Sequence, residues 1–283
     1  MRSKTWISKG GSLMFHVKQL MINNIQYEFV DEGQGTPVLL LHGFPDSKKL
    51  WYQMIPELTQ QGYRVIVPDL RGYGNTEVAA SYQIQDSAAD MFSLLTQLGI
   101  SRAHVIGHDW GAFLGWYLAA HYEAQVISYT ALSVGHPNGY LRSGGLKQLV
   151  KGSYIGLFVI PGVAERVLAA GDYKVLTKMA EDDRLHQHWY MDLTRPGRLS
   201  AGLNWYRHNL KSITAGIETV NVPVMGIIGT QDPALTTAQM KGSEKYVYGS
   251  FDYYEIAGGH WLPETHGDQL NQLIIPFLSR QRS

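Results

Sequence analysis

The 283-residue chain contains no cysteine, which excludes disulfide bonds, thiolate catalysis and cysteine-ligated metals. It has no excess charge of either sign: 24 Lys and Arg balance 24 Asp and Glu, leaving no net field to recruit nucleic acid or an anionic membrane. Long apolar runs are missing too, because the run at 273–278 is far too short to span a bilayer. Residues 1–9 are basic, but no apolar segment follows them, so no secretory signal is expected. These absences favour a soluble cytoplasmic enzyme.

Short apolar runs alternate with helical patterns along most of the chain, which predicts a parallel sheet covered by helices on both faces. Residues 25–30 alternate apolar and polar side chains instead, which predicts an antiparallel, half-exposed strand. The expected buried strands lie at 38–41, 64–67, 104–106, 126–134, 222–228 and 251–256, and the expected helices at 49–62, 84–98, 110–122 and in a last segment ending at Ser279.

The stretch from roughly His136 to Ile217 shows no buried-strand pattern. It is rich in Tyr, Trp, Arg and Leu and is broken at Pro161-Gly162 and Pro196-Gly197, which indicates short helices. We therefore expect one sheet domain with an inserted helical cap. The expected divisions are an N-terminal extension running into the first strand region (1–23), a first part of the core (24–136), the cap (137–217) and a second part of the core (218–283). Met14 is an alternative start, which would make residues 1–13 an upstream extension.

The most informative motif is Gly-His-Asp-Trp-Gly at 107–111, between an expected strand and an expected helix. A central residue flanked by small ones at such a junction is typical of a nucleophile elbow, which usually carries Ser. Gly107 and Gly111 let the strand and the helix pass closely. A carboxylate at the centre attacks an electrophilic carbon and forms an alkyl-enzyme ester that water must cleave. Taken alone, Asp109 has the alternative role of capping the following helix.

Two further residues follow Asp109 in the order of nucleophile, acid and histidine. Asp232 comes directly after the strand at 222–228, and His260 directly after the strand at 251–256. All three are therefore expected at the carboxyl edge of the sheet, where open α/β sheets bind ligands. Since Asp109 is ionised at neutral pH, it needs no base. His260 is then available to activate water, with Asp232 fixing its tautomer and stabilising the imidazolium.

Attack of water on the Asp109 ester places negative charge on the ester carbonyl oxygen. Two backbone N–H groups are expected to stabilise it, from Trp110 and from Phe44 in the loop after the strand at 38–41. Gly43 permits unusual backbone angles in that loop. The Phe44–Pro45 bond is a candidate cis peptide.

The segments that carry these residues resemble those of α/β-hydrolases of the epoxide hydrolase group, and the likeness runs from about Ile25 to Leu278. The resemblance implies the α/β-hydrolase fold: a mostly parallel eight-stranded sheet, helices on both faces and an inserted helical cap. It also implies conversion of an epoxide and water to a vicinal diol, without a cofactor. The segments concerned are His-Gly-Phe-Pro at 42–45, Asp-Leu-Arg-Gly-Tyr-Gly at 69–74, the elbow at 107–111 and Gly-His-Trp at 259–261.

The same resemblance implies two cap tyrosines that donate to the epoxide oxygen. Tyr206, within Leu-Asn-Trp-Tyr-Arg at 203–207, matches one of them. Tyr154, which precedes Pro-Gly-Val-Ala-Glu at 161–165, matches the other. A phenol suits this task because it stays protonated at neutral pH. Ordinary packing in a helical cap is the alternative role for either ring.

Haloalkane and haloacid dehalogenases resemble this elbow as well and use the same Asp nucleophile. Fluoroacetate dehalogenases carry Arg where this chain has Trp110. Haloalkane dehalogenases carry Trp there, often with Asn at the position of Phe44. The Phe44 side chain has no N–H to hold a halide, which argues against that reaction. The two tyrosines in turn favour an epoxide. A non-catalytic ligand-binding protein on this fold is a third, weaker alternative.

Aromatic side chains are expected to line the substrate pocket: Phe44, Trp110 and Trp51, although packing between sheet and cap explains Trp51 equally well. His108 is expected to pack within the elbow. His186 and His188 have no acidic third ligand nearby and are expected to be solvated, so no metal or cofactor is expected. The expected partner is a small-molecule epoxide, with neither nucleic acid nor membrane, and the protein itself a monomer or homodimer.

Overall fold

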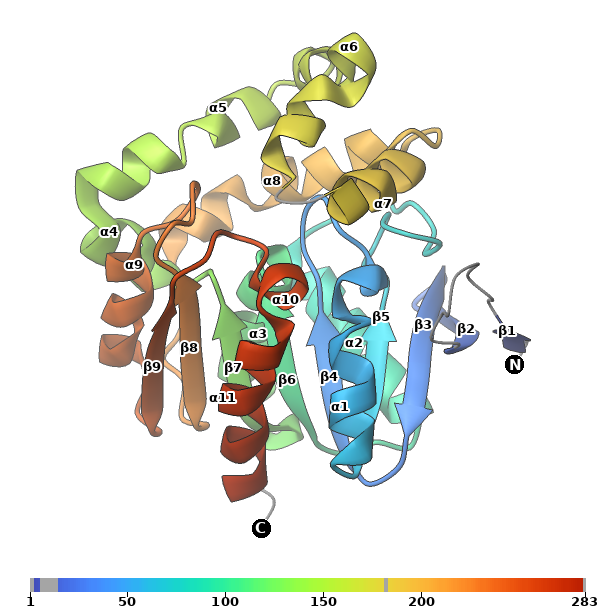
Figure 1. Cartoon of the computed structure of the whole chain (residues 1–283), viewed down its shortest axis with the longest axis vertical. Coiled ribbons are helices and arrows are strands. Elements are labelled where there is room, and N and C mark those ends of the chain that lie inside the picture. The colour runs from blue at the N-terminus through green and yellow to red at the C-terminus, as the bar shows by residue number, and fades with distance from the viewer. Residues whose placement is uncertain (1–2, 6–14, 181–182, 282–283) are drawn as a thin grey trace.

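The computed structural model describes residues 3–5, 15–180 and 183–281, and within them a nine-stranded sheet at the centre of the molecule (Figure 1). The strand order is β1-β2-β3-β5-β4-β6-β7-β8-β9. From β5 to β9 all neighbours are parallel, whereas β1, β2 and β3 pair antiparallel and β3 joins β5 antiparallel. The strands are β1 (Ser3–Thr5), β2 (His16–Ile22), β3 (Ile25–Gly33), β4 (Thr36–Leu41), β5 (Tyr63–Pro68), β6 (Ala103–His108), β7 (Val126–Leu132), β8 (Val224–Gly229) and β9 (Phe251–Ile256).

The sheet confirms the mostly parallel arrangement that the apolar runs predict. Strands β4 and β6 lie at its centre, and Val38 to Leu41 are fully buried. Such uninterrupted apolar runs arise because helices cover both faces of a parallel sheet. Figure 1 shows α1 (Met54–Gln60) and α11 (Gly267–Arg280) on one face and α2 (Ile84–Gln97) and α3 (Trp110–His121) on the other.

The antiparallel hairpin of β2 and β3 differs from the sequence-based expectations. Residues 16–22 form strand β2, which the apolar pattern does not predict, and Asn23 and Asn24 both have positive φ in the turn (46° and 64°), the geometry of a tight two-residue hairpin. The half-exposed character expected for residues 25–30 is wrong. Strand β3 lies between β2 and β5, and its polar residue Glu28 is buried because its carboxylate pairs with Lys48.

Five helices lie between β7 and β8 in the chain and sit above the carboxyl ends of the parallel strands (Figure 1). We call them the helical insertion, and they confirm that a helical segment interrupts the sheet domain. The breaks expected at Pro161-Gly162 and Pro196-Gly197 fall between helices. The helices are α4 (Pro137–Lys151), α5 (Tyr154–Phe158), α6 (Val163–Met179), α7 (Asp183–Leu193) and α8 (Arg198–Ala215).

The shorter elements connect these layers. They comprise η1 (Lys48–Trp51), η2 (Glu123–Gln125), α9 (Thr237–Lys241), η3 (Gly242–Tyr246) and α10 (Leu262–Thr265). Of the N-terminal extension expected over residues 1–23, positions 1–2 and 6–14, including the alternative start Met14, lie outside the described residues. Among the helices that are described, none is long and apolar enough to cross a membrane.

Candidate active site

Asp109 stands on the turn between β6 and α3, as the elbow motif predicts. Its backbone has φ 52° and ψ −121°, a conformation that side-chain-bearing residues rarely adopt. Such strain persists where surrounding packing holds it, commonly at functional sites. The turn projects the carboxylate from the carboxyl edge of the sheet toward the helical insertion.

The glycines around Asp109 are required by close contacts. A Cβ on Gly107 would lie 2.3 Å from the carbonyl oxygen of Gly111, and one on Gly111 would lie 2.1 Å from that of Leu41. Gly43 is equally constrained, because a Cβ there would lie 2.2 Å from Oδ1 of Asp109 and 2.5 Å from the backbone nitrogen of Trp110. The carboxylate thus packs directly against the backbone of the loop after β4.

His260 lies between the two carboxylates expected to flank it. Its Nδ1 is 2.7 Å from Oδ2 of Asp232, and its Nε2 is 3.7 Å from Oδ2 of Asp109. The other oxygen of Asp232, Oδ1, accepts the backbone N–H groups of Ala234 and Leu235 at 2.8 and 2.9 Å. Asp232 is fully buried and His260 nearly so. The structure therefore brings together all three residues of the sequence-based triad.

The two carboxylates govern the charge of His260. Burial alone would lower the pKa of this imidazole, but the charges and hydrogen bonds of Asp232 and Asp109 outweigh burial and raise it to about 10. Burial would in turn raise the pKa of Asp232, yet His260 and the two backbone N–H groups hold it below its usual value. At neutral pH the pair is thus an imidazolium and a carboxylate.

The loop after β4 supplies a backbone donor to Asp109. The N–H of Phe44 donates to Oδ1 of Asp109 at 2.7 Å, and the Phe44–Pro45 peptide is cis, as expected. Trp110 is the first residue of α3, so its N–H has no partner within that helix. Both groups expected to form an oxyanion hole therefore lie beside the Asp109 carboxylate.

Tyr154 and Tyr206 reach the same site from the helical insertion. Tyr154 begins α5 and Tyr206 lies in the middle of α8; their ring centroids are 6.3 Å apart, and the Tyr206 ring lies 5.0 Å from that of Trp110. Burial, and next the charge of Asp109, raise the pKa of both phenols well above 10. Both side chains are therefore protonated hydrogen-bond donors at neutral pH.

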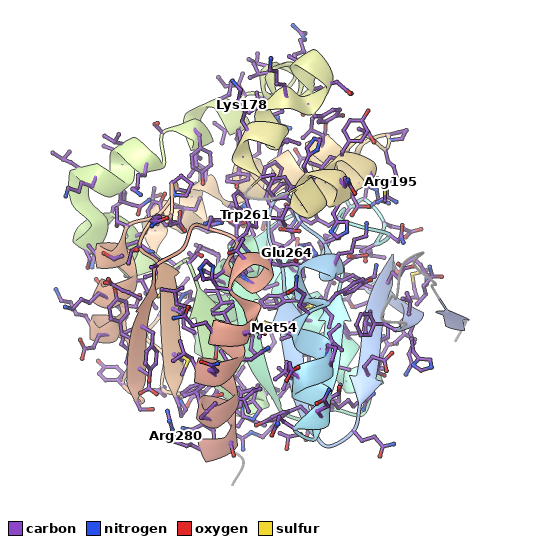
Figure 2. All side chains as sticks on the ribbon, in the orientation of Figure 1. Met54, Lys178, Arg195, Trp261, Glu264 and Arg280 are labelled. Carbon is purple, nitrogen blue, oxygen red and sulfur yellow. The ribbon has the colours of Figure 1, made fainter. Side chains whose placement is uncertain are left out.

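Two cavities meet at these residues, since Asp109, Tyr154 and Tyr206 line both. The smaller, about 50 Å³, extends toward α4, where Tyr140 forms part of its wall. The larger, about 790 Å³, extends past His260 toward α6. Figure 2 shows two of its lining residues, Lys178 on α6 and Trp261 beneath it in the loop after β9.

Of the three aromatic residues expected to line the pocket, Phe44 and Trp110 do so. Trp51 is fully buried and borders neither cavity. His108 is buried within the elbow, where its Nε2 lies 2.9 Å from the carbonyl oxygen of His260. Burial, reinforced by the charge of His260, lowers the pKa of His108 to about 3, so it packs as a neutral ring.

Comparison with known proteins places this site within a family. The family model described as "alpha/beta hydrolase fold" matches residues 36–188, more than half of the chain. The chain belongs to the alpha/beta hydrolase family. A similar curated member is the AB hydrolase superfamily protein YfhM of Bacillus subtilis, 33% identical over 87% of this chain and 91% of that protein.

Several alpha/beta hydrolases similar to this one are named epoxide hydrolases. Epoxide hydrolase A of Mycobacterium tuberculosis is 30% identical over 91% of this chain and 95% of its own length. Among solved structures, an epoxide hydrolase from Vigna radiata superposes with a TM-score of 0.81 at 26% identity, covering 94% of this chain and 98% of that one. Epoxide hydrolase A from Mycobacterium thermoresistibile gives a TM-score of 0.79 at 26% identity, covering 93% and 98% of the two chains.

Several residues around the site of this hydrolase carried no sequence signal. Tyr140 on α4 and Leu168 on α6 line the cavities, and Lys151 donates to the carbonyl oxygens of Asp232 and Leu235. Each depends on how the helical insertion folds over the sheet, which local patterns do not encode. Within the described residues, no group of three His, Cys, Asp or Glu side chains is arranged to hold a metal ion.

Proposed function

We propose that this alpha/beta hydrolase converts an epoxide and water to a vicinal diol through an ester on Asp109. The observation that carries the proposal is the meeting of a carboxylate and two protonated phenols, Tyr154 and Tyr206, at one pair of cavities. The naming of similar proteins as epoxide hydrolases supports it. In this proposal the helical insertion is a cap over residues 137–217, and the protein acts in the cytoplasm.

In the first half-reaction, Oδ2 of Asp109 attacks a ring carbon. Oδ1 accepts the N–H of Phe44, which leaves Oδ2 as the attacking oxygen. The carbon–oxygen bond of the ring breaks, and its electron pair stays on the epoxide oxygen. Donation from Tyr154 and Tyr206 stabilises that developing charge.

In the second half-reaction, water attacks Cγ of the Asp109 ester while His260 Nε2 takes its proton. The negative charge that forms on Oδ1 is stabilised by the N–H groups of Phe44 and Trp110. Collapse of this intermediate breaks the Cγ–Oδ2 bond and expels the diol, whose Oδ2 takes the second proton of the water. The oxygen of the water becomes part of the Asp109 carboxylate.

The charge of His260 couples the two halves. An imidazolium cannot accept a proton, and the resting pKa of about 10 makes His260 cationic. Formation of the ester removes the negative charge of Asp109, one of the groups that raise this pKa, so His260 releases its proton more readily. The proton that His260 releases makes up for the proton that the opened epoxide oxygen gains. The neutral imidazole then acts as the base.

A His260→Gln variant tests the proposal, because it retains the nucleophile but lacks the base. Mixed with an epoxide, it is expected to accumulate an adduct with the mass of the epoxide on the peptide containing Asp109. The double variant Asp109→Asn/His260→Gln is the control and is expected to show none. No adduct, together with no diol from the wild-type enzyme across small, aromatic and fatty-acid epoxides, would overturn the proposal.

Carbon–halogen hydrolysis would use the same carboxylate and histidine but would not need a phenol donor. Phe44 contributes a backbone N–H and an apolar ring, with no side-chain donor for a halide. Replacing Tyr206 with Phe separates the two reactions. The epoxide reaction is expected to lose most of its rate, whereas halide release from a haloalkane would be unaffected. Ligand binding without turnover that survives Asp109→Asn would instead indicate a non-catalytic protein.

A further inference from the structure

The outer surface of the helical insertion exposes an unusual number of apolar side chains. Among the described residues, eight of the fourteen exposed large apolar side chains lie between Leu141 and Val175. On α4, Leu146, Leu149 and Val150 follow the three- and four-residue spacing of one helix face, and Leu146 is 80% and Val150 71% exposed. The intervening Gln148 is fully buried, so α4 turns this apolar face outward.

Exposed apolar side chains continue along the chain beyond α4. In Figure 1, α4 lies at the side of the molecule beside α9, and α5 and α6 continue from it to the top of the helical insertion. Ile160, just after α5, and Val163 and Val167 on the first turns of α6 are exposed as well. We define the docking surface as Leu146, Leu149, Val150, Ile160, Val163 and Val167 together with four exposed basic residues of the same helices, Lys147, Arg166, Lys174 and Lys178.

The basic residues give the segment 137–180 a net positive charge, which the whole chain does not have. Residues 137–180 contain six Lys or Arg and only two Asp or Glu, against an overall balance of 24 and 24. One of the two acids, Glu165, is paired with Arg207, and the other, Asp172, accepts the hydroxyl of Tyr190. Lys147, Arg166, Lys174 and Lys178 are exposed, so the surface combines apolar side chains with positive charge.

The docking surface is continuous with the opening of the larger cavity. Val167, Val175 and Lys178 line that cavity and are also exposed on α6. The cavity walls further in are mainly apolar, with Leu168 and Phe158 among them. An apolar molecule that leaves the docking surface therefore has a direct route toward Asp109.

We propose that the docking surface binds the surface of an anionic lipid bilayer. Apolar side chains that insert among lipids, combined with Lys and Arg beside anionic headgroups, are the two contributions that hold proteins at such interfaces. The net charge of zero does not oppose this binding, because a bilayer meets only one side of the molecule. A second copy of the chain fits less well, since a symmetric contact would place the basic residues against each other.

Docking would also explain why the cavity opens on this surface, a point that rests on the proposed function. An apolar epoxide partitions into the bilayer and would enter the cavity from there. Binding to lipid can be measured without turnover, and turnover of a water-soluble epoxide without lipid. Failure of docking and failure of the proposed reaction are therefore separable.

Co-sedimentation with vesicles tests the proposal. The wild-type protein is expected to bind phosphatidylcholine vesicles that contain phosphatidylglycerol, to bind pure phosphatidylcholine at least tenfold less, and to dissociate at high salt. The variant Lys147→Gln/Lys174→Gln is expected to bind about 25-fold more weakly, since each basic residue near an anionic surface contributes a factor of about five. The variant Leu146→Ser/Leu149→Ser/Val150→Ser is expected to lose binding by a similar factor.

The matched control is Met21→Ser/Val78→Ser/Tyr248→Ser, three exposed apolar residues on other parts of the molecule, which is expected to bind like the wild type. All variants are expected to hydrolyse a water-soluble epoxide at the wild-type rate, which shows that they are folded. No preference for anionic vesicles, or undiminished binding by the Leu146 triple variant, would overturn the proposal. So would a wild-type dimer that this triple variant dissociates, since the surface would then be a contact between copies.

Discussion

Replacing Asp232 with Asn should separate the two half-reactions. Oδ1 of Asp232 accepts two backbone N–H groups, so the amide oxygen of Asn must take that position. The amide NH₂ then faces Nδ1 of His260. In the wild-type protein this nitrogen lies 2.7 Å from Oδ2 of the Asp232 carboxylate. An NH₂ donor forces Nδ1 to accept and places the imidazole proton on Nε2. His260 is left without a lone pair directed at the hydrolytic water.

The magnitude follows from this tautomer change. In the serine proteases, the equivalent Asp-to-Asn change lowers kcat about 10⁴-fold, which corresponds to roughly 5 kcal/mol in the barrier. We expect hydrolysis of the ester to fall by about 10³–10⁴-fold here. Attack by Asp109 needs no base, so its rate should change by less than about tenfold.

Rapid-quench kinetics and intact-protein mass spectrometry measure both steps. The variant is expected to consume one equivalent of epoxide per site in a fast burst, followed by a very slow steady state with the ester as the main species. The control is Asp268→Asn, an exposed acid on α11, which should turn over normally. If the burst is lost as completely as turnover, or if hydrolysis falls less than tenfold, the assignment of His260 to the second step alone is refuted.

Four further outcomes are expected. Tyr206→Phe should slow ester formation about 10²–10³-fold, the usual cost of removing a donor to a developing oxyanion, as single-turnover kinetics would show. Gly43→Ala should lower kcat/KM at least about 100-fold, because its Cβ would lie 2.2 Å from Oδ1 of Asp109. Trp51→Phe should leave KM unchanged and affect only Tm, since Trp51 borders neither cavity; a raised KM would contradict this. Asp46→Asn should raise the unfolding free energy near pH 7 by on the order of 4 kcal/mol.

The Asp46 outcome rests on linkage between ionisation and folding. Burial, and next the charges of Glu264 and Asp109, raise the pKa of Asp46 to about 8. The unfolded chain loses this proton near pH 4 while the folded protein keeps it until about pH 8, so the stability present below pH 4 declines across that range. Urea unfolding at several pH values should show a smaller decline in Asp46→Asn. Equal pH dependence in both proteins would contradict the shifted pKa.

The elements that could be predicted from the sequence are those whose residues satisfy local constraints. Buried parallel strands such as β4 and β8 are short apolar runs, and the elbow needs two glycines around one residue, so both stand out in the sequence. The triad follows from its order along the chain and from the rule that parallel strands end at one edge. Strand β2 of the hairpin could not be predicted, because apolar and polar residues alternate only weakly along it and its turn is Asn-Asn rather than a glycine turn.

The features that could not be predicted depend on contacts between distant segments. Glu28 is buried because residues distant in the chain meet it inside the molecule: Lys48, twenty residues away, and Asn75 both donate to its Oε1. Trp51 is aromatic like the residues that line the pocket, but its element η1 packs against β4, β5 and α10, so Trp51 is buried away from both cavities. The outward apolar face of α4 is equally hidden in the sequence, since the same spacing describes a helix that packs inward.

The ester mechanism requires that Asp109 itself supply an oxygen to the product. A single turnover in H₂¹⁸O, with enzyme in excess over epoxide, follows that oxygen. The expected result is a diol without ¹⁸O and one ¹⁸O atom in the peptide that contains Asp109. A diol labelled in that first turnover, with Asp109 unlabelled, would mean that water attacks the epoxide directly and would contradict the ester mechanism.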